Sequence, residues 1–527
     1  FSQPPLPSKA MVRRAGGLIA VALVSALTAQ ANRCDGPQVG CPPWWCPPKK
    51  PKHALYYNGI SDIAPACFNL TEDDQRPHTV YIIGDWGGVL YGGVWAAPAD
   101  HRSMQFKAHH RQFVNGVDNL AQQKVAKSMM QHADYDRVGY IINVGDNFYW
   151  GGIDGKCGQD MDAFDGGPQW TYVFEKMYHG PLDNLQWLGV LGNHDWGGWN
   201  YLSAWDQMIS YTWGGPGSTN RWFQPALFYK LRAIYNRDPS AGPGVEEGFV
   251  IDYFFLDTNI YDAFDPETDP AHNICGTSHN QQLKGCPVTG PDSPGACKFW
   301  FVKIWKAQCS WLAIQLENSV LQTDWQIAVT HFPPLWGMQF WQGITKKYGV
   351  DLMITGHTHH QRLWAPWGNN PLGGTAVIIS GGGGGITSEE VPDLNGWDDE
   401  YGFFKLELHR TEIIIRGVSH GAQLRKELRL YQLQPSYHIP PRDSSPALAA
   451  VTPGVQDPDH DYKEEANHAR IKEATKQSKI ENLLDQLENA RHSEMKKDDF
   501  MKIRKLSTVD PSRIYGMDME NVSEQLV

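Results

Sequence analysis

The chain lacks the long apolar runs of membrane-spanning proteins. Beyond its first 33 residues, no stretch reaches the length of about 18 apolar residues that a transmembrane helix needs. It also lacks an excess of positive charge, because 46 Lys and Arg face 58 Asp and Glu, for a formal net charge of −12. Non-specific nucleic-acid binding requires a basic face, so no nucleic-acid partner is expected. None of the cysteines has the CxxC spacing of a zinc site.

The N-terminal segment is typical of a signal peptide. Arg13 and Arg14 precede an apolar run over residues 17–27, and Ala29-Gln30-Ala31 has the small residues of a cleavage site. We therefore expect residues 1–31 to contain upstream residues and a signal peptide. A short membrane anchor is the alternative interpretation.

All nine cysteines follow this segment, which favours an oxidising compartment and disulfide bonds. The odd number leaves at least one thiol free or bridged to a partner, and the pairing cannot be deduced. Asn69 and Asn521 lie in glycosylation acceptor patterns. The sequence therefore predicts a secreted glycoprotein, or one of the endomembrane or vacuolar lumen.

Composition divides the rest of the chain into four parts. A main domain is framed by an irregular, Cys- and Pro-rich lead-in and by a linker rich in Pro, Ser and Ala. The last part is charged, with a narrow apolar stripe that predicts a helical tail. We place the lead-in at 32–78, the main domain at 79–431, the linker at 432–461 and the tail at 462–527.

The main domain alternates between strand and helix patterns. Short apolar runs predict strands at 79–83, 138–144, 187–191, 249–256, 325–329 and 351–355. Helical spacing predicts helices at 105–133 and 298–320. Further strands are expected at 375–380, 402–408 and 411–418. This pattern predicts a layered α/β domain, and such sheets bind ligands beyond the carboxyl ends of their strands.

Polar motifs follow five of these strands. Asp85 lies in GDWGG, Asp146 and Tyr149 in GDNFY, Asn193 and His194 in GNHD, His331 in THFPP, and His357 and His359 in GHTHH. A single Gly-Asp after a strand is usually a turn, and two nearby histidines are often only solvated. Side chains two residues apart in an extended segment share a face, so His357 and His359 can converge on one metal ion. Recurrence of such motifs at successive strand ends favours a site over a series of turns.

The order of these motifs resembles that of the metallophosphoesterases, and within them the small, tartrate-resistant type of purple acid phosphatase. Tyr149 distinguishes the purple acid phosphatases from the related Ser/Thr protein phosphatases, because the latter have Asp-Arg-Gly in this segment. The likeness extends from Thr79 to about Leu430 and includes FYKL at 228–231 and LDT at 256–258. It implies a layered β-sandwich flanked by helices, with residues 79–431 as the catalytic domain.

The resemblance also implies a dinuclear metal centre. A ferric ion would be held by Asp85, Asp146, Tyr149 and His359, and a divalent ion (Fe, Zn or Mn) by Asn193, His331 and His357, with Asp146 bridging. Carboxylate and phenolate oxygens suit a trivalent ion, whereas imidazole and amide groups suit a softer divalent one. By the same resemblance, His194 is the catalytic residue that binds the phosphate or protonates the leaving oxygen. Packing behind the site is its alternative role.

The implied activity is that of an acid phosphatase. A metal-bound hydroxide would attack phosphate monoesters, either phosphorylated small molecules or phosphoproteins. One alternative is a non-catalytic scaffold or anchor that uses the fold for assembly and docks a protein partner on its tail. Another is a phosphodiesterase or nucleotide hydrolase, which shares the site and differs at the pocket rim.

The sequence departs from the family pattern at four places, of which the segment between His331 and His357 bears on substrate preference. Ala328 replaces the first Val of the VxxH motif, and the segment between His331 and His357 is short and lacks the extra His found there. His360 stands where the small enzymes often have Asn, and we expect it at the pocket rim. The stretch 263–297 has the appearance of a disulfide-bearing insertion, to which the sequence assigns no role.

Overall fold

The computed structural model describes residue 34 and residues 41–432, apart from gaps at 71–76, 89–110, 150, 154, 156, 159, 162–166, 198–203, 216, 238–246, 269–272, 278–285 and 287–289. The chain divides into the units Phe1–Pro440 and Pro441–Val527. The predicted signal peptide, the helical tail and all but the first residue of the linker lie outside the described residues.

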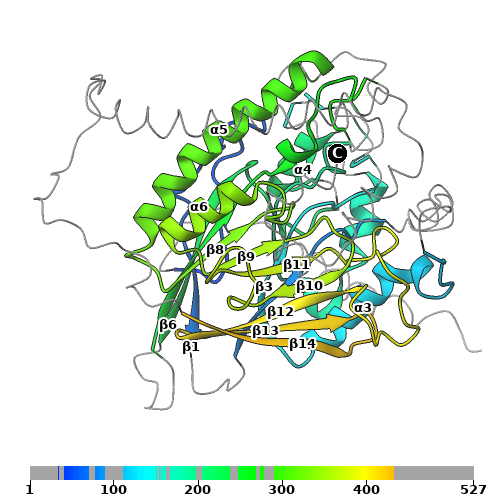
Figure 1. Ribbon diagram of the computed structural model, residues 1–527, viewed down its shortest axis with the longest axis vertical. Helices are drawn as coiled ribbons and strands as arrows, with labels where there is room; N and C mark the ends of the chain where they lie inside the picture. Colours follow the sequence, from blue (N-terminus) through cyan, green and yellow to red (C-terminus); the bar gives the residue numbers. More distant parts are fainter. Residues whose placement is uncertain are drawn as a thin grey trace, which may run out of the picture. The chain divides into compact units, whose positions relative to one another are not determined.

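Two seven-stranded mixed sheets form the centre of the first unit (Figure 1). In spatial order, one contains β1 (Ala66–Leu70), β6 (Tyr229–Arg237), β7 (Phe249–Phe255), β8 (Trp325–Val329), β9 (Leu352–Thr355), β11 (Ala376–Ser380) and β10 (Gln361–Trp364). The other contains β14 (Leu424–Tyr431), β13 (Glu412–Ser419), β12 (Gly402–Leu408), β2 (His78–Ile83), β3 (Arg137–Asn143), β4 (Gln186–Gly189) and β5 (Trp222–Phe223). Fully buried side chains from both sheets, such as Val80 and Ile327, join one apolar cluster, so the sheets pack face to face.

A second apolar cluster joins the outer faces of the sheets to helices. The helices are α3 (Ala121–Ala133), α4 (Trp205–Ser210), α5 (Pro294–Ser319) and α6 (Met338–Tyr348). Ser293 caps α5, because its hydroxyl accepts a hydrogen bond from the backbone N–H of Ala296. Gly349 caps the C-terminus of α6, and its φ of +69° suits glycine. The layered, helix-flanked β-sandwich expected from the sequence is confirmed.

None of the helices in the described part of the chain has the length and apolar character that crossing a bilayer requires.

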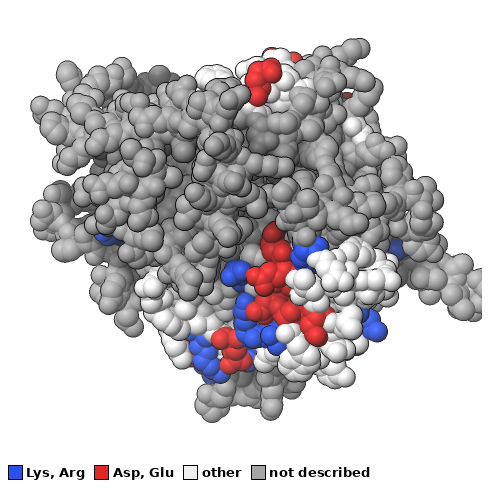
Figure 2. All heavy atoms as spheres, turned by 45° about the vertical axis from the view of Figure 1, so that its right-hand side comes forward, with Lys and Arg blue, Asp and Glu red and all other residues white. Residues whose placement is uncertain are grey.

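On the face shown in Figure 2, described acidic and basic side chains lie next to one another, without a broad patch of one sign. The ion pairs of β13 and β14, such as Arg416 with Glu427 and Arg429 with Glu412, show the same interleaving.

The helix predicted at 105–133 is too long at its N-terminal end. α3 begins at Ala121 after a single 3-10 turn at Asp118–Leu120, and residues 111–117 are not helical. The Asp118 carboxylate accepts the backbone N–H of Val114 and pairs with Arg111, while Gly116 has a φ of +86°. These local contacts hold the chain in a turn where apolar spacing alone predicts helix.

The lead-in is not irregular throughout, because residues 66–70 within it form β1, which pairs in parallel with β6. Disulfides Cys34–Cys46 and Cys41–Cys67 link this segment internally. Two further disulfides, Cys157–Cys286 and Cys275–Cys297, involve the insertion at 263–297, and Cys309 is free. The expectations of disulfides and of one unbridged thiol therefore agree with the structure.

Candidate metal centre

The motif residues converge because their strands run in the same direction. β2, β3 and β4 are parallel neighbours in one sheet, and β8 and β9 are parallel neighbours in the other. The loops after the first three strands carry Asp85, Asp146, Tyr149 and Asn193, and those after the other two carry His331, His357 and His359. Both sheets therefore contribute side chains to one site at their carboxyl ends.

Three of the motif residues have a backbone conformation that L-amino acids rarely adopt. The φ angles are +57° at Asp85, +52° at Asp146 and +69° at His357. Such strain persists only where surrounding contacts impose it, and it is concentrated at functional sites. Here the Asp85 backbone N–H donates to Gly145 O at 2.9 Å, and the His357 N–H donates to Asp85 Oδ2 at 3.0 Å. Hydrogen bonds between the loops at the strand ends therefore hold these residues in their unusual backbone conformations.

Two overlapping groups of side chains have the spacing needed to hold a metal ion. One consists of Asp146, His331 and His357, and the other of Asp85, Asp146 and His359; within each, the ligand atoms lie within 4.8 Å of one another. Asp146 belongs to both groups, so its carboxylate lies where a bridging ligand is needed.

Tyr149 and Asn193, the predicted ligands that are neither Asp nor His, lie next to these two groups. The Tyr149 hydroxyl donates to Asp146 Oδ2 at 2.9 Å and lies 3.2 Å from Asp85 Oδ1. Asn193 Oδ1 lies 3.1 Å from His331 Nε2. The structure therefore brings all of the predicted ligand side chains together.

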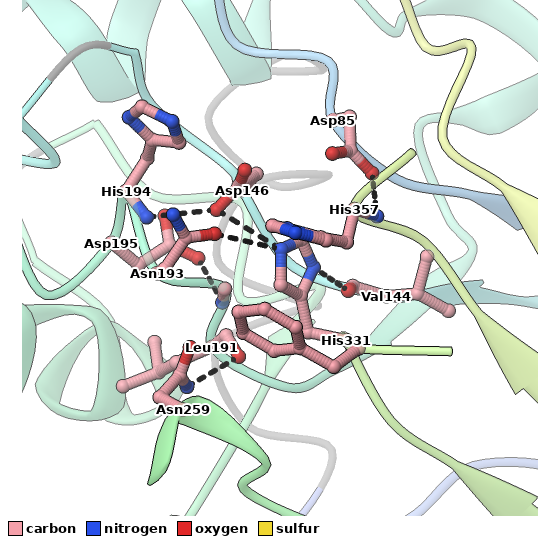
Figure 3. A network of polar contacts seen from close by, with 12 residues as sticks. Asp85, Val144, Asp146, Leu191, Asn193, His194, Asp195, Asn259, His331 and His357 are labelled. Atoms are coloured by element: carbon pink, nitrogen blue, oxygen red, sulfur yellow. Dashed lines mark hydrogen bonds and ion pairs between the residues drawn. The ribbon is translucent and has the colours of Figure 1, made fainter. Parts of the chain in front are cut away.

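The contacts of His331 leave its Nε2 atom as a hydrogen-bond acceptor that faces the cluster. Its Nδ1 lies 2.8 Å from the backbone carbonyl of Val144, which can only accept, so Nδ1 carries a proton. In the neutral ring Nε2 then presents a lone pair, yet it faces Asn193 Oδ1 at 3.1 Å and Asp146 Oδ1 at 3.4 Å (Figure 3). Acceptors that face one another in a buried site require a proton or a cation between them.

His359 is arranged in the same way. Its Nδ1 lies 3.1 Å from Glu389 Oε1, while its Nε2 faces the Tyr149 hydroxyl at 3.4 Å and Asp85 Oδ1 at 3.6 Å. A histidine that donates its outer N–H to a carboxylate or carbonyl is a common feature of metal ligands, because that bond fixes the tautomer. Glu389 was not predicted, because it stands in no recognised motif and lies 30 residues from His359 in the chain.

Burial and neighbouring charges shift the pKa values of the carboxyl and imidazole groups in the cluster. Burial, together with the neighbouring Asp146, raises the pKa of Asp85 well above its usual range. Burial acts in the same direction on Asp146, but His331 and His194 outweigh it and hold the pKa of Asp146 low. Burial opposes the charged form of His331, yet the Asp146 carboxylate raises its pKa to about 9. A proton or bound cations can accommodate buried carboxylates this close, and the carboxylate and imidazole donors of the two groups fit metal ions.

His194 and Asp195 lie beside the cluster rather than within it. The His194 ring centroid is 4.5 Å from that of Tyr149, and its backbone N–H donates to Asp146 Oδ1 at 2.9 Å. Asp195 accepts the backbone N–H groups of Gly192 and Asn147, both at 2.8 Å. Asp195 therefore holds the loop that carries Asn193, and the His194 ring stays on the side of Asp146 away from His331 (Figure 3).

Aromatic side chains line the neighbourhood of His357. The ring centroid of Phe332 lies 4.0 Å from that of His357, and the half-buried Trp336 packs edge-on against His357 at 5.0 Å and against Phe332 at 5.7 Å. His360 is also half-buried, and it receives a hydrogen bond of 2.8 Å from Arg362 Nε. Burial and the positive charge of Arg362 lower the pKa of His360 to about 3.

Residues 78–361 match the family Metallophos, the calcineurin-like phosphoesterases, and the chain belongs to that family. A comparison with curated proteins found no significant match. Solved structures with a similar fold include GAP50, the anchor in the inner membrane complex of Plasmodium, at 17% identity and a TM-score of 0.45 over 68% of this chain and 90% of that one. Another is the purple acid phosphatase PPD1 of yellow lupin, at 13% identity and a TM-score of 0.37 over 74% and 59%.

Proposed function

We propose that this metallophosphoesterase is a purple-type acid phosphatase that hydrolyses phosphate monoesters at an iron-containing dinuclear centre. The observation that carries the proposal is the pair of ligand groups that share Asp146. A shared carboxylate flanked by two sets of donors is the arrangement that two adjacent cations need. The contact of Tyr149 with the Asp85 side of the site favours iron there, because phenolate is a hard anionic donor.

In this proposal Asp85, Asp146, Tyr149 and His359 hold the ferric ion, and Asn193, His331 and His357 hold the divalent ion together with Asp146. When bound, the two ions supply positive charge to a phosphate group and lower the pKa of water at the site. The chain fixes the donors before any ligand arrives, since the strained backbones at Asp85, Asp146 and His357 set their directions.

His194 is proposed to move a proton during the reaction. It is 3% exposed and stands against the Tyr149 ring, so its imidazole borders the cluster without belonging to either ligand group. From there its ring N–H can donate to a phosphate oxygen or to the leaving oxygen of the ester. The nearby Trp336 offers an apolar surface to the organic part of the substrate.

The colour of the protein and its activity test this proposal together. Purified protein is expected to be violet from charge transfer between tyrosinate and iron, and to release phosphate from a simple phosphomonoester at acid pH. Tyr149→Phe is expected to abolish the colour. A folded protein with two ions but no phosphomonoester activity would instead favour the phosphodiesterase alternative if it cleaves diesters, and the scaffold alternative if it cleaves neither.

A further inference from the structure

The amide nitrogen of the Asn193 side chain is hydrogen-bonded to Asp262, a residue that lies in none of the sequence motifs. Asp262 is the last residue of the 3-10 turn η6 (Asn259–Asp262) and is 4% exposed. Its Oδ2 accepts a hydrogen bond from Asn193 Nδ2 at 3.1 Å. The other end of the same amide, Oδ1, lies 3.1 Å from His331 Nε2. The Asn193 amide is therefore clamped between a carboxylate and the metal-binding cluster.

This contact determines which end of the amide faces the cluster. A carboxamide has a donor end and an acceptor end of similar size, and only the oxygen can bind a metal ion. An ionised carboxylate accepts hydrogen bonds and cannot donate them, so Asp262 selects the NH2 end and leaves Oδ1 pointing at His331. We infer that Asp262 is a positioning residue that presents Asn193 Oδ1 to the divalent ion. The inference rests on the proposed two-metal function.

The disulfide-bearing insertion supports Asp262. The backbone carbonyl of Asp262 accepts the N–H of Ile274 at 2.9 Å, immediately before the Cys275–Cys297 disulfide. The side-chain oxygen of Asn273 accepts the N–H groups of Phe264 and Cys275 at 3.0 and 2.9 Å. These hydrogen bonds hold the insertion against the turn and thereby fix the position of the Asp262 carboxylate. The insertion at 263–297 thereby acquires a role that the sequence did not assign.

The turn is also tied to the loop that carries Asn193. Asn259 Nδ2 donates to the backbone carbonyl of Leu191 at 3.0 Å (Figure 3). The same Nδ2 donates to Asp257 Oδ2 at 2.9 Å. Leu191 precedes Asn193 by two residues, so the donor and acceptor of the 193–262 pair are fixed relative to one another. A rigid frame of this kind is what an outer residue needs to orient a ligand.

The first test compares two neighbouring acids of the same segment. Asp262→Asn lets the Asn193 amide bond in either orientation, so it is expected to weaken binding of one ion by roughly 10- to 100-fold. The second ion and the tyrosinate colour are expected to remain. Asp265→Asn is the matched control, because Asp265 is exposed and pairs on the surface with Lys298. Titration of the metal-depleted proteins with Zn²⁺ or Mn²⁺, followed by metal analysis, gives both affinities.

The second test exchanges the two side chains. Asn193→Asp sets a carboxylate against Asp262 and is expected to bind the divalent ion weakly. Adding Asp262→Asn restores a donor and an acceptor, so the double variant is expected to bind at least tenfold more tightly than Asn193→Asp alone, at roughly the lower end of the range for outer-residue effects. A purely structural role for Asp262 predicts that the second substitution only adds damage.

The outcomes separate the two proposals. Wild-type affinity in Asp262→Asn, or a double variant no better than Asn193→Asp, overturns the positioning role while the two-metal site stands. If wild-type protein binds neither Zn²⁺ nor Mn²⁺ in the same titration, the proposed function itself fails. Loss of one ion in Asp262→Asn, with colour retained and with recovery in the double variant, supports the inference.

Discussion

At the scale of single residues, the site depends on which nitrogen of each histidine carries the proton. The Val144 carbonyl fixes Nδ1–H on His331, and the Glu389 carboxylate does the same for His359. Both rings then present Nε2 inward, toward carboxylate, amide or phenol oxygens. Residues outside the motifs therefore prepare the ligands for cations before any ion is present.

Glu389→Gln is expected to lower the affinity of the ferric position by roughly 10- to 100-fold, because a neutral amide no longer fixes the tautomer of His359. Iron content and the intensity of the violet colour measure this effect. Glu390→Gln is the control, since Glu390 is the exposed neighbour of Glu389 and, among the described residues, its side chain makes no hydrogen bond or ion pair with a proposed ligand. Equal iron content and colour in both variants would show that Glu389 does not support His359.

His194→Ala is expected to slow phosphomonoester hydrolysis by roughly 10²- to 10⁴-fold, the usual contribution of a general acid. Both ions are expected to stay bound, because the side chain of His194 belongs to neither ligand group. Steady-state kinetics beside metal analysis distinguish the two effects. Loss of an ion from this variant would instead place the His194 side chain among the ligands.

Sequence motifs predicted the residues that meet at the site but not those that hold them. Asp85 and His357 could be found because a Gly-Asp or Gly-His pair ends an apolar strand, a pattern local in the chain. Glu389 and Asp262 lie in segments without periodicity, and their partners are far away in sequence. Such pairs are set by the packing of loops, which a single sequence does not encode in any local pattern.

At the scale of elements, the glycine run after β11 determines how closely the site is enclosed. A Cβ added at Gly385 would lie 2.6 Å from the Tyr149 ring, and one added at Gly356 would lie 2.6 Å from Asp85 Oδ2. No side chain fits at these positions without moving a proposed ligand. The glycines at 381–385 therefore let this loop pass close to Tyr149.

Gly385→Ala is expected to lower the free energy of unfolding by about 1–3 kcal/mol, as overpacking usually does, and to weaken the violet colour by displacing Tyr149. Gly343→Ala is the matched control. Gly343 lies inside α6 with no atom near the added Cβ, so alanine there is expected to stabilise the protein by about 1 kcal/mol. Denaturant unfolding and absorption spectra compare them; unchanged colour in Gly385→Ala would contradict the proposed contact.

Element prediction succeeded where the hydrophobic pattern is strong. The central strands β2, β3, β8 and β9 are fully or mostly buried apolar runs, and each was predicted within two residues of its bounds. The strand β14 was missed because its charged residues alternate along an edge, where packing rather than composition decides. α6 was missed because eleven residues with an internal glycine give a weak helical signal.

At the scale of the whole catalytic unit, the ligands come from both sheets, so bound ions join the two halves of the sandwich. Asp85, Asp146 and Asn193 follow strands of one sheet, whereas His331 and His357 follow strands of the other. An ion that binds only the folded protein stabilises it according to its concentration relative to its dissociation constant.

Removal of the ions by a chelator is therefore expected to lower the Tm of the protein. The loss is about 2.7 kcal/mol if the free ion had stood at about 100 times its dissociation constant. Differential scanning calorimetry of the metal-loaded and chelated forms measures the difference. Asp146→Ala serves as the control, because loss of the shared carboxylate should make its Tm insensitive to the chelator.

Metal analysis of three forms tests the central claim, that two ions share the Asp146 carboxylate, most directly. We predict two ions per chain in wild-type protein, one in His331→Ala and none in Asp146→Ala, with each variant confirmed as folded by circular dichroism. Wild-type protein without metal, or Asp146→Ala with both ions still bound, would contradict it.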